Sequence, residues 1–588
     1  DTNQKYKFYQ NKKSFNKSNQ EYFNNENNWT RSHGNNNSNR FSSLKQINNS
    51  NAHKLKLKWI FKSPENSGDI QANPIVYEGT IFTPISGGYI AALDAATGKT
   101  KWMSEKFGYF AARRGLVLVQ GKNELENRIY FSNRERLICL DANNGKRIKS
   151  FGGDGDVKTG LNVMTPVIFQ DQIIVVTWDH SVESYDLITG KTKWKIKYRD
   201  YIKKRVGSKK YNNLGSNPWG GISLDEKRGL LFLTTGNPHA YFDGTLRPGT
   251  NPGSNSVIAV DLLKKKIIWS FQETSHDIWN SDLPAPPILT AIKKNNILID
   301  VVVVPTKRGN TLILDRISGE PIHEFRYRLS AQSNLPGEKT SLYQPDLSLP
   351  EPFAKNVFRN SDFWSYDEKK LAIIKKKYEN YNFGFYQPYE IDKKNLQYNF
   401  NGGAEWMGAS INHKDQNMYV TSNNIPWEAW VERIDFKNNV PSYSSFFHRA
   451  LVEEENIPIS KPPWGTITSL NLSTGKIHWQ IPFGEYKELI NKNIPRTGTE
   501  NFGGVTGTEG NVIFATGTLD KKFYVFDTID GKELFSFELP YIGSAPPTTF
   551  FYNGTQYVIL HATGGSTLQQ GYPDLVENGN AIVAFSIN

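Results

Sequence analysis

A recurring hairpin constrains the fold of this chain more than any other feature. Each copy has an alternating apolar strand ending in Asp or Asn, a turn that in most copies carries Gly-Lys, and a second strand opening on Trp or Phe. The seven copies pair Asp94 with Trp102, Asp141 with Phe151, Asp186 with Trp194, Asp261 with Trp269, Asp315 with Phe325, Asn471 with Trp479, and Asp527 with Phe535 or Phe537. The acidic residue caps the turn, glycine supplies positive φ, and the aromatic side chain packs between neighbouring sheets. Each copy is therefore predicted to be the third-to-fourth strand hairpin of a four-stranded blade.

Two strands at the ends of the chain lack a hairpin partner. Residues 581–585 read as a third strand with no fourth strand after it, and residues 55–61 read as a fourth strand with none before it. Pairing these two strands would close a ring and remove the exposed edges of an open array. The sequence therefore predicts an all-β fold, an eight-bladed β-propeller closed by pairing of its N- and C-terminal strands, over residues 51–588.

Two segments depart from the repeat. Most copies lie about 45 to 75 residues apart, close to one blade each, but the interval from Asp315 to Asn471 is much longer. An insertion is expected at about 327–401, with a helix near 365–381, and long propeller insertions usually form rims or lids. Residues 1–50 are rich in Asn, Ser and Lys with little apolar periodicity, so this extension is expected to wrap the surface or to be loose.

Composition excludes several classes of protein. The 588 residues carry a net charge of +12, but Lys and Arg are scattered, which argues against a nucleic-acid partner. The single cysteine, Cys139, excludes an intrachain disulfide and lies in an apolar run. The longest apolar run, near residues 297–305, is strand-sized and too short for a membrane helix. The first residue is Asp1, which fits a removed signal peptide and a trimmed chain equally; a periplasmic, soluble or peripheral protein is the expectation.

Four segments between the repeats are not required by the blades. They are Ser275–Pro287 (SHDIWNSDLPAPP), Pro305–Arg316 (PTKRGNTLILDR), the pair 217–221 (NPWGG) and 234–238 (TTGNP), and 113–116 (RRGL). Together they resemble the dehydrogenases that depend on pyrroloquinoline quinone (PQQ), particularly the membrane glucose dehydrogenase type and its soluble relatives. The resemblance runs from about residue 40 to the C-terminus and rests on the order of the segments rather than on one motif.

The resemblance implies a cofactor site and a metal site. It implies that Trp219 stacks on the flat cofactor, that Arg114 pairs with a cofactor carboxylate, that Lys307 reaches the quinone oxygens, and that Thr165 and Trp406 also bind the cofactor. It further implies a metal held by Asn237, with Asp179 and Asp282 as further ligands; Ca²⁺ is expected and a lanthanide is an alternative. A planar tricarboxylate needs an aromatic face, cations and a hard metal with oxygen ligands, so these residue types form a coherent set.

The catalytic base is the main departure from the family pattern. The family places a carboxylate where this chain has Asn280, and an amide cannot accept a proton at neutral pH. Asp282, two residues on, points to the same side if the segment is extended, and it could serve as base or as a metal ligand. Asp277 is a second candidate, and a cofactor-binding protein with slow turnover is a third explanation. His276 and His180 are expected to be packing or rim residues.

Two functions from different classes follow. The first is PQQ- and Ca²⁺-dependent oxidation of a sugar, polyol or other alcohol to the carbonyl, with electrons passed to a quinone or cytochrome. No adjacent cysteines lie near Arg114, which favours the glucose or polyol branch over the methanol and ethanol type. The second is a non-catalytic propeller that binds other proteins, for which the segment 275–287 and the insertion would be unnecessary.

Overall fold

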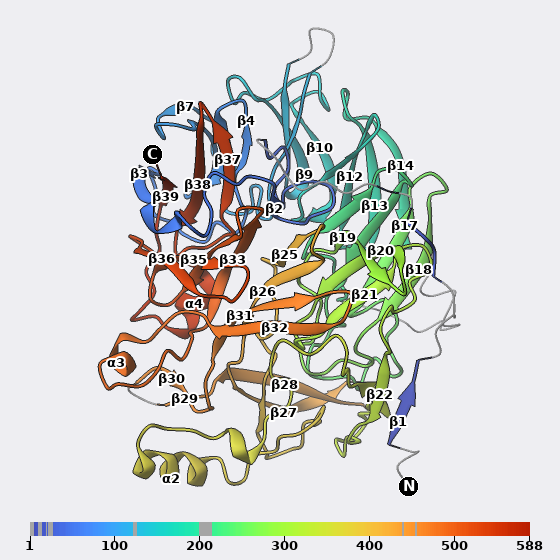
Figure 1. Cartoon of the computed structure of the whole chain (residues 1–588). Helices are drawn as coiled ribbons and strands as arrows, with labels where there is room; N and C mark the ends of the chain where they lie inside the picture. Colours follow the sequence, from blue (N-terminus) through green and yellow to red (C-terminus); the bar gives the residue numbers. More distant parts are fainter. Residues whose placement is uncertain are drawn as a thin grey trace.

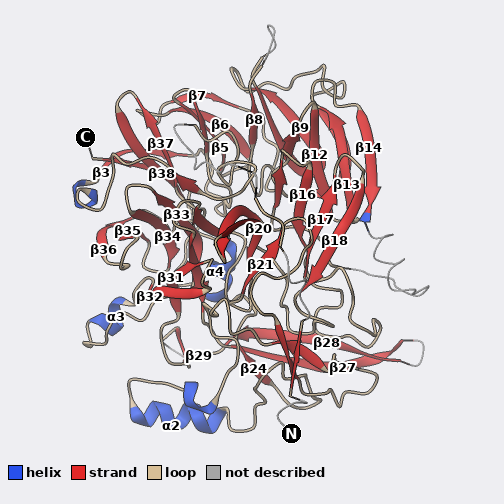
Figure 2. Ribbon diagram, turned by 45° about the vertical axis from the view of Figure 1, so that its right-hand side comes forward, coloured by secondary structure: helices blue, strands red, loops and turns tan. Residues whose placement is uncertain are grey.

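The computed structural model describes residues 5–9, 15–18, 20, 28–121, 126–198, 215–437, 440–452 and 455–587. Over these residues the fold is all-β and propeller-like, with small antiparallel sheets that follow one another along the chain (Figures 1 and 2). The sheets of the repeat are β4 (Ile75–Tyr77), β5 (Thr80–Ile85), β6 (Tyr89–Asp94) and β7 (Thr100–Met103); β8 (Val117–Val119), β9 (Arg128–Asp141) and β10 (Asp156–Asn162); β11 (Val167–Phe169), β12 (Gln172–Thr177), β13 (Ser181–Asp186) and β14 (Thr192–Lys197); β15 (Ile222–Asp225), β16 (Leu230–Thr234), β17 (Ser256–Asp261) and β18 (Lys266–Gln272); β19 (Ile288–Lys294), β20 (Ile297–Pro305) and β21 (Thr311–Asp315); β25 (Ala409–Asn412), β26 (Asn417–Asn423), β31 (Gly465–Asn471) and β32 (Lys476–Pro482); β33 (Asn501–Thr508), β34 (Val512–Thr518), β35 (Lys522–Asp527) and β36 (Glu533–Glu538), with β2 (Phe41–Ser42) parallel to β33; and β3 (Lys56–Lys62), β39 (Ala581–Ser586), β38 (Thr555–Ala562) and β37 (Thr548–Tyr552).

The predicted pairing of the two terminal strands is present. Strand β3 runs antiparallel to β39, with Leu57 opposite Phe585 and Phe61 opposite Ile582. This sheet is antiparallel and contains strands from both ends of the chain. Its apolar side chains pack on the β4–β7 sheet on one side and on the β33–β36 sheet on the other. The two ends of the repeat region are thus joined within one sheet, in which β39 is an inner strand between β3 and β38.

Five of the seven copies form the hairpin of two strands that the sequence predicts. After Asp141 and Asp315 the expected fourth strand is reduced to single bridges, Leu140–Arg147 and Leu314–Pro321. The Asp94 carboxylate accepts hydrogen bonds from the backbone N–H groups of Ala96 and Thr97, at 3.2 and 3.0 Å, and so caps the turn between β6 and β7. The indole Nε1 of Trp102, on β7, donates to the carbonyl of Ala142 in the next hairpin at 2.9 Å. The Trp102 ring covers Gly145 of that same hairpin, whose φ is +73°. Trp269 and Trp479 dock in the same way, onto the turns at Gly319 and Gly531 of the next sheets, whereas the indole of Trp194 donates to Gln172 in its own sheet.

Replacing Gly145 by Ala is expected to destabilise the protein by about 2–4 kcal/mol, because the side chain adds left-handed backbone strain and also crowds a packed ring. A Cβ at this position would lie 2.3 Å from Cε3 of Trp102. Gly153 is the matched control, since its φ is +93° and a Cβ there would meet nothing within 4 Å. Urea denaturation should show the larger loss for Gly145→Ala; equal losses in the two variants would contradict the docking role.

The insertion and a second excursion form a cap at one end of the molecule, where Figure 1 shows β27, β28 and α2 together. Its elements are β22 (Arg326–Leu329) and β23 (Tyr343–Pro345), which form a sheet with β1 (Tyr6–Phe8), then β24 (Asn395–Gln397), β27 (Trp427–Lys437), β28 (Val440–Arg449), β29 (Leu451–Val452), β30 (Ile457–Pro458), η3 (Asn360–Asp362) and α2 (Glu368–Lys377). Helix α2 confirms the helix expected near 365–381, and its N-cap is Asp367. Within the described residues the remaining short helices are η2 (Ala52–Lys54), α3 (Lys487–Ile490) and α4 (Ser566–Gly571).

The expectation that the first fifty residues lie on the surface or are loose is wrong for residues 28–42, which we call the axial strap. Its backbone bonds to β4 at Val76, to β8 at Leu118, to β15 at Leu224, to β19 at Leu289 and to β25 at Ile411, and its last residues form β2 beside β33. These are first strands of their sheets, met in chain order, and the segment before β11 is reached by the Arg31 side chain at the Pro166 carbonyl. Trp29, Arg31, His33 and Arg40 of the strap are buried.

Arg31 is the most extensively bonded side chain of the axial strap. Its guanidinium donates to the carbonyls of Pro166, Ile222, Thr165 and Asn35, at 3.0, 3.0, 3.2 and 3.2 Å. Burial, and next the charge of Arg40, lower the pKa of Arg31 to about 9, so the side chain remains charged at neutral pH. An Asn- and Ser-rich composition is typical of disordered segments. Residues 28–42 are ordered because the first strands of the sheets provide hydrogen-bond partners for their backbone.

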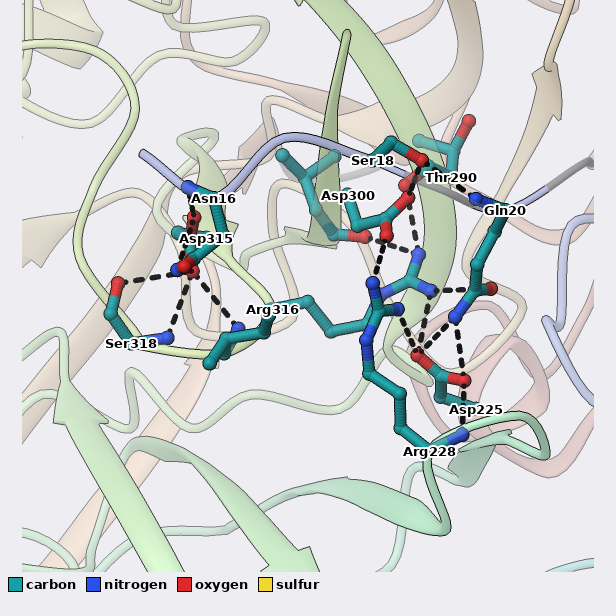
Figure 3. Close-up of polar contacts among 12 residues, drawn as sticks. Asn16, Ser18, Gln20, Asp225, Arg228, Thr290, Asp300, Asp315, Arg316 and Ser318 are labelled. Atoms are coloured by element: carbon teal, nitrogen blue, oxygen red, sulfur yellow. Dashed lines mark hydrogen bonds and ion pairs between the residues drawn. The ribbon is translucent and has the colours of Figure 1, made fainter. Parts of the chain in front are cut away.

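A second N-terminal segment lies across two sheets (Figure 3). Gln20 Nε2 donates to both oxygens of Asp225, at 2.9 and 3.0 Å, and Ser18 Oγ donates to Asp300 at 2.5 Å. The same two carboxylates bind Arg228, at 2.9 and 2.6 Å. Ser18 and Gln20 therefore add hydrogen bonds from neutral side chains to an ion-pair network between β15 and β20, in agreement with an extension that wraps the surface.

Candidate active site

Six of the residues predicted for the site line one cavity of about 380 Å³. The six are Arg114, Trp219, Asn237, Asn280, Asp282 and Lys307, and the wall is completed by Phe110, Arg113, Val163, Trp178, Gly215, Asn217, Gly236 and Tyr241. They come from segments that precede the first strand of a sheet (β8, β15, β19) or follow its second strand (β16, β20). Because these connections emerge at the same end of each sheet, residues almost 200 positions apart in sequence converge.

Asp282 is held by two side chains of the cavity. Lys307 Nζ lies 2.5 Å from its Oδ1, and the indole Nε1 of Trp219 donates to its Oδ2 at 2.9 Å. Burial opposes the charge on Lys307, but the carboxyls of Asp282 and Glu405 outweigh it and raise the pKa of the ammonium. The cavity therefore contains an intact carboxylate–ammonium pair next to an aromatic face.

Arg114 brings a positive charge with no carboxylate partner of its own in the described part of the chain. Its guanidinium lies 5.0 Å from the ring centres of both Trp219 and Trp406, and it donates to the neutral side chain of Gln71. Its Nε atom is buried without a hydrogen-bond partner. Burial, and next the neighbouring Arg113, lower the pKa of Arg114 to about 9, which leaves it cationic at neutral pH. Such a cation between two aromatic faces suits a flat anion.

Arg113 differs from its neighbour because its charge is neutralised. Its Nη2 lies 2.6 Å from the carboxylate of Asp69, and its Nη1 donates to the Asp69 carbonyl at 2.8 Å. Tyr109 and Ser566 also donate to this carboxylate, at 2.7 and 2.6 Å. Arg113 thus fixes the wall of the cavity while Arg114 remains available to a ligand.

The segment around Asn280 is a folded turn. The prediction that Asp282 lies on the same side as Asn280 assumed that this segment is extended, and that assumption is wrong. The Asp277 carboxylate accepts the backbone N–H groups of Trp279 and Ser281, both at 2.9 Å, and Asn280 has a φ of +63°. Asn280 and Asp282 nevertheless line the same cavity. Asn280 Nδ2 donates to the carbonyl of Phe400 at 2.9 Å, and its Oδ1 accepts from Asn237. The two amides therefore form one hydrogen-bonded pair on the cavity wall.

Three predicted residues, Thr165, Asp179 and Trp406, lie outside the cavity lining. The Trp406 ring stacks on Phe502 and reaches the site through Arg114. Thr165 is buried, and its Oγ1 donates to the backbone carbonyl of Arg114 at 2.7 Å. The side chain of Asp179 is 47% exposed; it accepts from Thr177 and lies 3.5 Å from Lys195. The cavity receives Trp178 at this position instead. Thr165 thus supports the arginine loop from behind, and Asp179 faces an exposed lysine.

The insertion covers the segment 275–287. Gln344 exchanges two hydrogen bonds with the backbone of Ser275, at 3.2 and 2.6 Å, and the indole of Trp279 donates to the carbonyl of Gln387 at 2.7 Å. His276 is buried against Glu338 at 2.6 Å, which supports its expected packing role. His180 is also buried, and its ring lies 2.8 Å from the Gly215 carbonyl. The cap therefore orders the turn that carries Asn280 and Asp282.

Several site residues escaped the sequence analysis. Phe110 and Tyr241 line the cavity, Gln71 binds Arg114, and Glu405 lies against Lys307. Only Glu405 had a usable signal, because it directly precedes Trp406. The other three belong to loops whose course depends on tertiary contacts.

Comparison with known proteins decides the family. The profile described as "Glucose/ethanol/alcohol dehydrogenase, beta-propeller domain" of the PQQ group matches residues 29–558. The chain belongs to this family. Membership assigns it to the PQQ quinoprotein dehydrogenases, oxidoreductases that act on alcohol or sugar CH–OH groups.

Named relatives share about a quarter of their residues with this quinoprotein. Quinoprotein glucose dehydrogenase of Escherichia coli (strain K12) is 27% identical over 93% of this chain and 77% of its own length. Quinate/shikimate dehydrogenase (quinone) of Acinetobacter baylyi is 26% identical over the same shares. Among solved structures, quinohemoprotein alcohol dehydrogenase from Comamonas testosteroni matches with a TM-score of 0.69 and 20% identity, covering 95% of this chain and 80% of the other. A europium-containing methanol dehydrogenase matches with a TM-score of 0.69 and 19% identity, covering 95% and 98%.

Two features are absent from the described residues. No helix in them combines the length and apolar character needed to cross a membrane. No three His, Cys, Asp or Glu side chains in that part of the chain lie close enough to bind a metal ion together.

Proposed function

We propose that this quinoprotein uses PQQ to oxidise a sugar, a polyol or another alcohol to the carbonyl product and passes the electrons to a quinone or cytochrome acceptor. The observation that carries the proposal is the cavity shared by the Trp219 ring, the Lys307–Asp282 pair and the Arg114 guanidinium, which has no carboxylate partner among the described residues. Relatives named as glucose, quinate and glycerol dehydrogenases support this substrate class.

The residues of the cavity fit the cofactor. PQQ is a planar tricarboxylate, and the site provides a cation whose Nε atom has no partner, a second cation in Lys307 and flat aromatic surfaces in Trp219 and Trp406. Thr165 would act through Arg114 by fixing the backbone of that residue. When bound, the quinone would supply the carbonyl that accepts hydride, polarised by a hard cation.

A metal site is proposed next to the amide pair. Asn237 and Asp282 line the cavity with hard oxygen donors, the kind that Ca²⁺ and lanthanides prefer, and Asn280 adds a further amide oxygen. Asp179 would have to leave Lys195 to become a ligand. We therefore place Asn237 and Asp282 first in the ligand set and Asp179 outside it.

Asp282 is proposed as the base that accepts the proton of the substrate hydroxyl. It lines the cavity, whereas the oxygens of Asp277 are buried and occupied by N–H donors from Trp279, Ser281 and Asn255. Asn280 would orient groups by hydrogen bonding, since its amide cannot accept the proton. Lys307 would hold Asp282 until the cofactor competes for the ammonium.

The architecture and location complete the proposal. We propose that the sheets of the repeat are eight blades and that the β3–β39 pair closes their ring, supported by the apolar cluster on each side of that sheet. The propeller would occupy residues 51–588 with the insertion at 327–401, after the N-terminal extension 1–50. A periplasmic location is proposed from the relatives alone.

Reconstitution tests the function. Purified protein is titrated with PQQ together with Ca²⁺ or a lanthanide, and dye reduction is then measured across sugars, polyols and alcohols. We expect a cofactor spectrum and turnover of at least one class. A spectrum without turnover would instead support a cofactor-binding protein of low activity, the alternative suggested by Asn280, and no spectrum at all would leave the protein-binding scaffold.

Replacing Arg114 by Gln is expected to weaken PQQ binding by about 10- to 100-fold, because a charge-assisted hydrogen bond contributes about 1.5–3 kcal/mol. The quenching of tryptophan fluorescence during PQQ titration reports the affinity, since Trp219 and Trp406 flank this arginine. The control is Arg134→Gln, an exposed arginine outside the cavity lining. Equal affinities in the two variants would remove Arg114 from the cofactor site.

A further inference from the structure

Glu405 lies next to Lys307 but is not part of the cavity lining. It stands between β24 and β25, its side chain is 1% exposed, and its Oε1 has no hydrogen-bond partner among the described residues. The backbone brings it there by close packing: Ala404 N donates to the carbonyl of Thr306 at 3.0 Å, and Gly403 has a φ of +57°. A Cβ at Gly403 would lie 2.2 Å from the Lys307 carbonyl oxygen, so only glycine permits this approach.

The Lys307 ammonium lies between two carboxyl groups. Its Nζ is 2.5 Å from Asp282 Oδ1 and 3.8 Å from Glu405 Oε1, and all three side chains are buried. The first contact is a hydrogen-bonded pair, while the second leaves an acceptor empty within reach of a small rotation of the lysine side chain. Lys307 therefore has two alternative partners, and Asp282 and Glu405 can compete for its ammonium group.

We propose that Glu405 is a positioning residue that draws the Lys307 ammonium away from Asp282 and so frees Asp282 to accept the proton of the substrate hydroxyl. This inference rests on the proposed function of Asp282 as base. Glu405 touches neither the cavity nor a bound substrate; it acts through Lys307. It also supplies what the folded turn at Asn280 lacks, a second carboxylate near the reacting groups.

The charges around Glu405 make this exchange depend on pH. Burial raises the pKa of Glu405 to about 8; Lys307 and Arg114 oppose this rise, and Asp282 and Glu500 add to it. Below that pH the Glu405 carboxyl is neutral, and Lys307 remains with Asp282. Above it the Glu405 carboxylate competes for the ammonium, so the fraction of free Asp282, and with it kcat, increases as pH rises through about 8.

The first experiment uses the full chain without cofactor. Tryptophan emission is recorded from well below to well above pH 8, because Trp219 donates to Asp282 and Trp406 adjoins Glu405. Wild type is expected to show a transition near 8 that Glu405→Gln lacks. Glu273→Gln is the matched control: Glu273 is another buried carboxyl with its pKa raised to about 7 by burial, but its partners are Asn310 and Thr306 rather than Lys307. It should keep the transition near 8.

A second variant covers the case in which Glu405→Gln does not fold, as judged by circular dichroism. Lys307→Met removes the cation that lowers the Glu405 pKa, so the transition should move above 8. An unchanged midpoint in Lys307→Met, or a transition near 8 that persists in folded Glu405→Gln, would overturn the proposal.

The reconstituted enzyme provides the functional readout. We expect wild-type kcat to rise through pH 8, whereas Glu405→Gln should lose this rise and show a kcat about tenfold lower above it, with KM unchanged. A retained rise in Glu405→Gln would overturn the role of Glu405. If wild type shows no activity with any substrate, the proposed function fails, but the emission transition still decides whether Glu405 and Lys307 are coupled.

Discussion

Replacing Asp282 by Asn is expected to lower kcat by about 10²–10⁴-fold, the usual contribution of a general base. The carboxylate lines the cavity, whereas the neighbouring position 280 holds an amide that cannot accept a proton. The substitution keeps the size of the side chain, so the cavity and the indole contact of Trp219 should persist. The measurement is dye reduction at saturating alcohol or sugar, after PQQ binding has been verified by titration.

The variant that exchanges the two positions, Asn280→Asp with Asp282→Asn, gives the sharper test. Both side chains line the cavity, so a carboxylate at position 280 should restore part of the lost rate if the reaction needs only a base at that wall. Wild-type kcat in Asp282→Asn with PQQ bound would show that the base lies elsewhere. Unimpaired chemistry together with loss of Ca²⁺ dependence would instead assign Asp282 to the metal alone.

Replacing Arg31 by Met is expected to destabilise the protein by about 3–5 kcal/mol. Four backbone carbonyls lose their donor, each unsatisfied buried group costs about 1–3 kcal/mol, and removal of a buried charge offsets part of this. Arg359→Met is the control, since Arg359 is exposed in the cap. Denaturation in guanidinium chloride, followed by tryptophan emission, measures both. A similar small shift in the two variants would contradict a role of Arg31 in joining the sheets.

The hairpins could be predicted from sequence because their determinants are local. Asp94 caps a turn a few residues away, and a glycine such as Gly145 provides the backbone that docks an aromatic ring. The pairing of β3 with β39 was predictable by elimination, because each of these two strands lacks a hairpin partner in its own part of the sequence. The axial strap was not predictable, because its bonds go to backbone groups of distant strands, and these leave no pattern in the sequence.

In the candidate site, too, residues in local motifs were predictable, whereas features that depend on tertiary contacts were not. Arg114, Trp219, Asn237 and Lys307 were found from motifs, and the structure brings them to one cavity with Asp282. Thr165 and Asp179 lie outside it because the direction of a side chain depends on the course of its loop. The turn at Asn280 was not foreseen, since it depends on Asp277 capping two N–H groups. Glu405 was missed because its proximity to Lys307 arises from tertiary packing at Gly403.

The pairing of β3 with β39 has a consequence for the order of events during synthesis. The two strands are separated by more than 500 residues, so at about 5–20 residues per second β3 waits roughly 25 to 100 s for its partner. During that interval β3 has no neighbour, and the axial strap has been made before most of the strands that will surround it. A product that stops short of residue 581 would keep β38 as an open edge, available for pairing with another chain. Strand β39 thus decides whether both β3 and β38 find a partner.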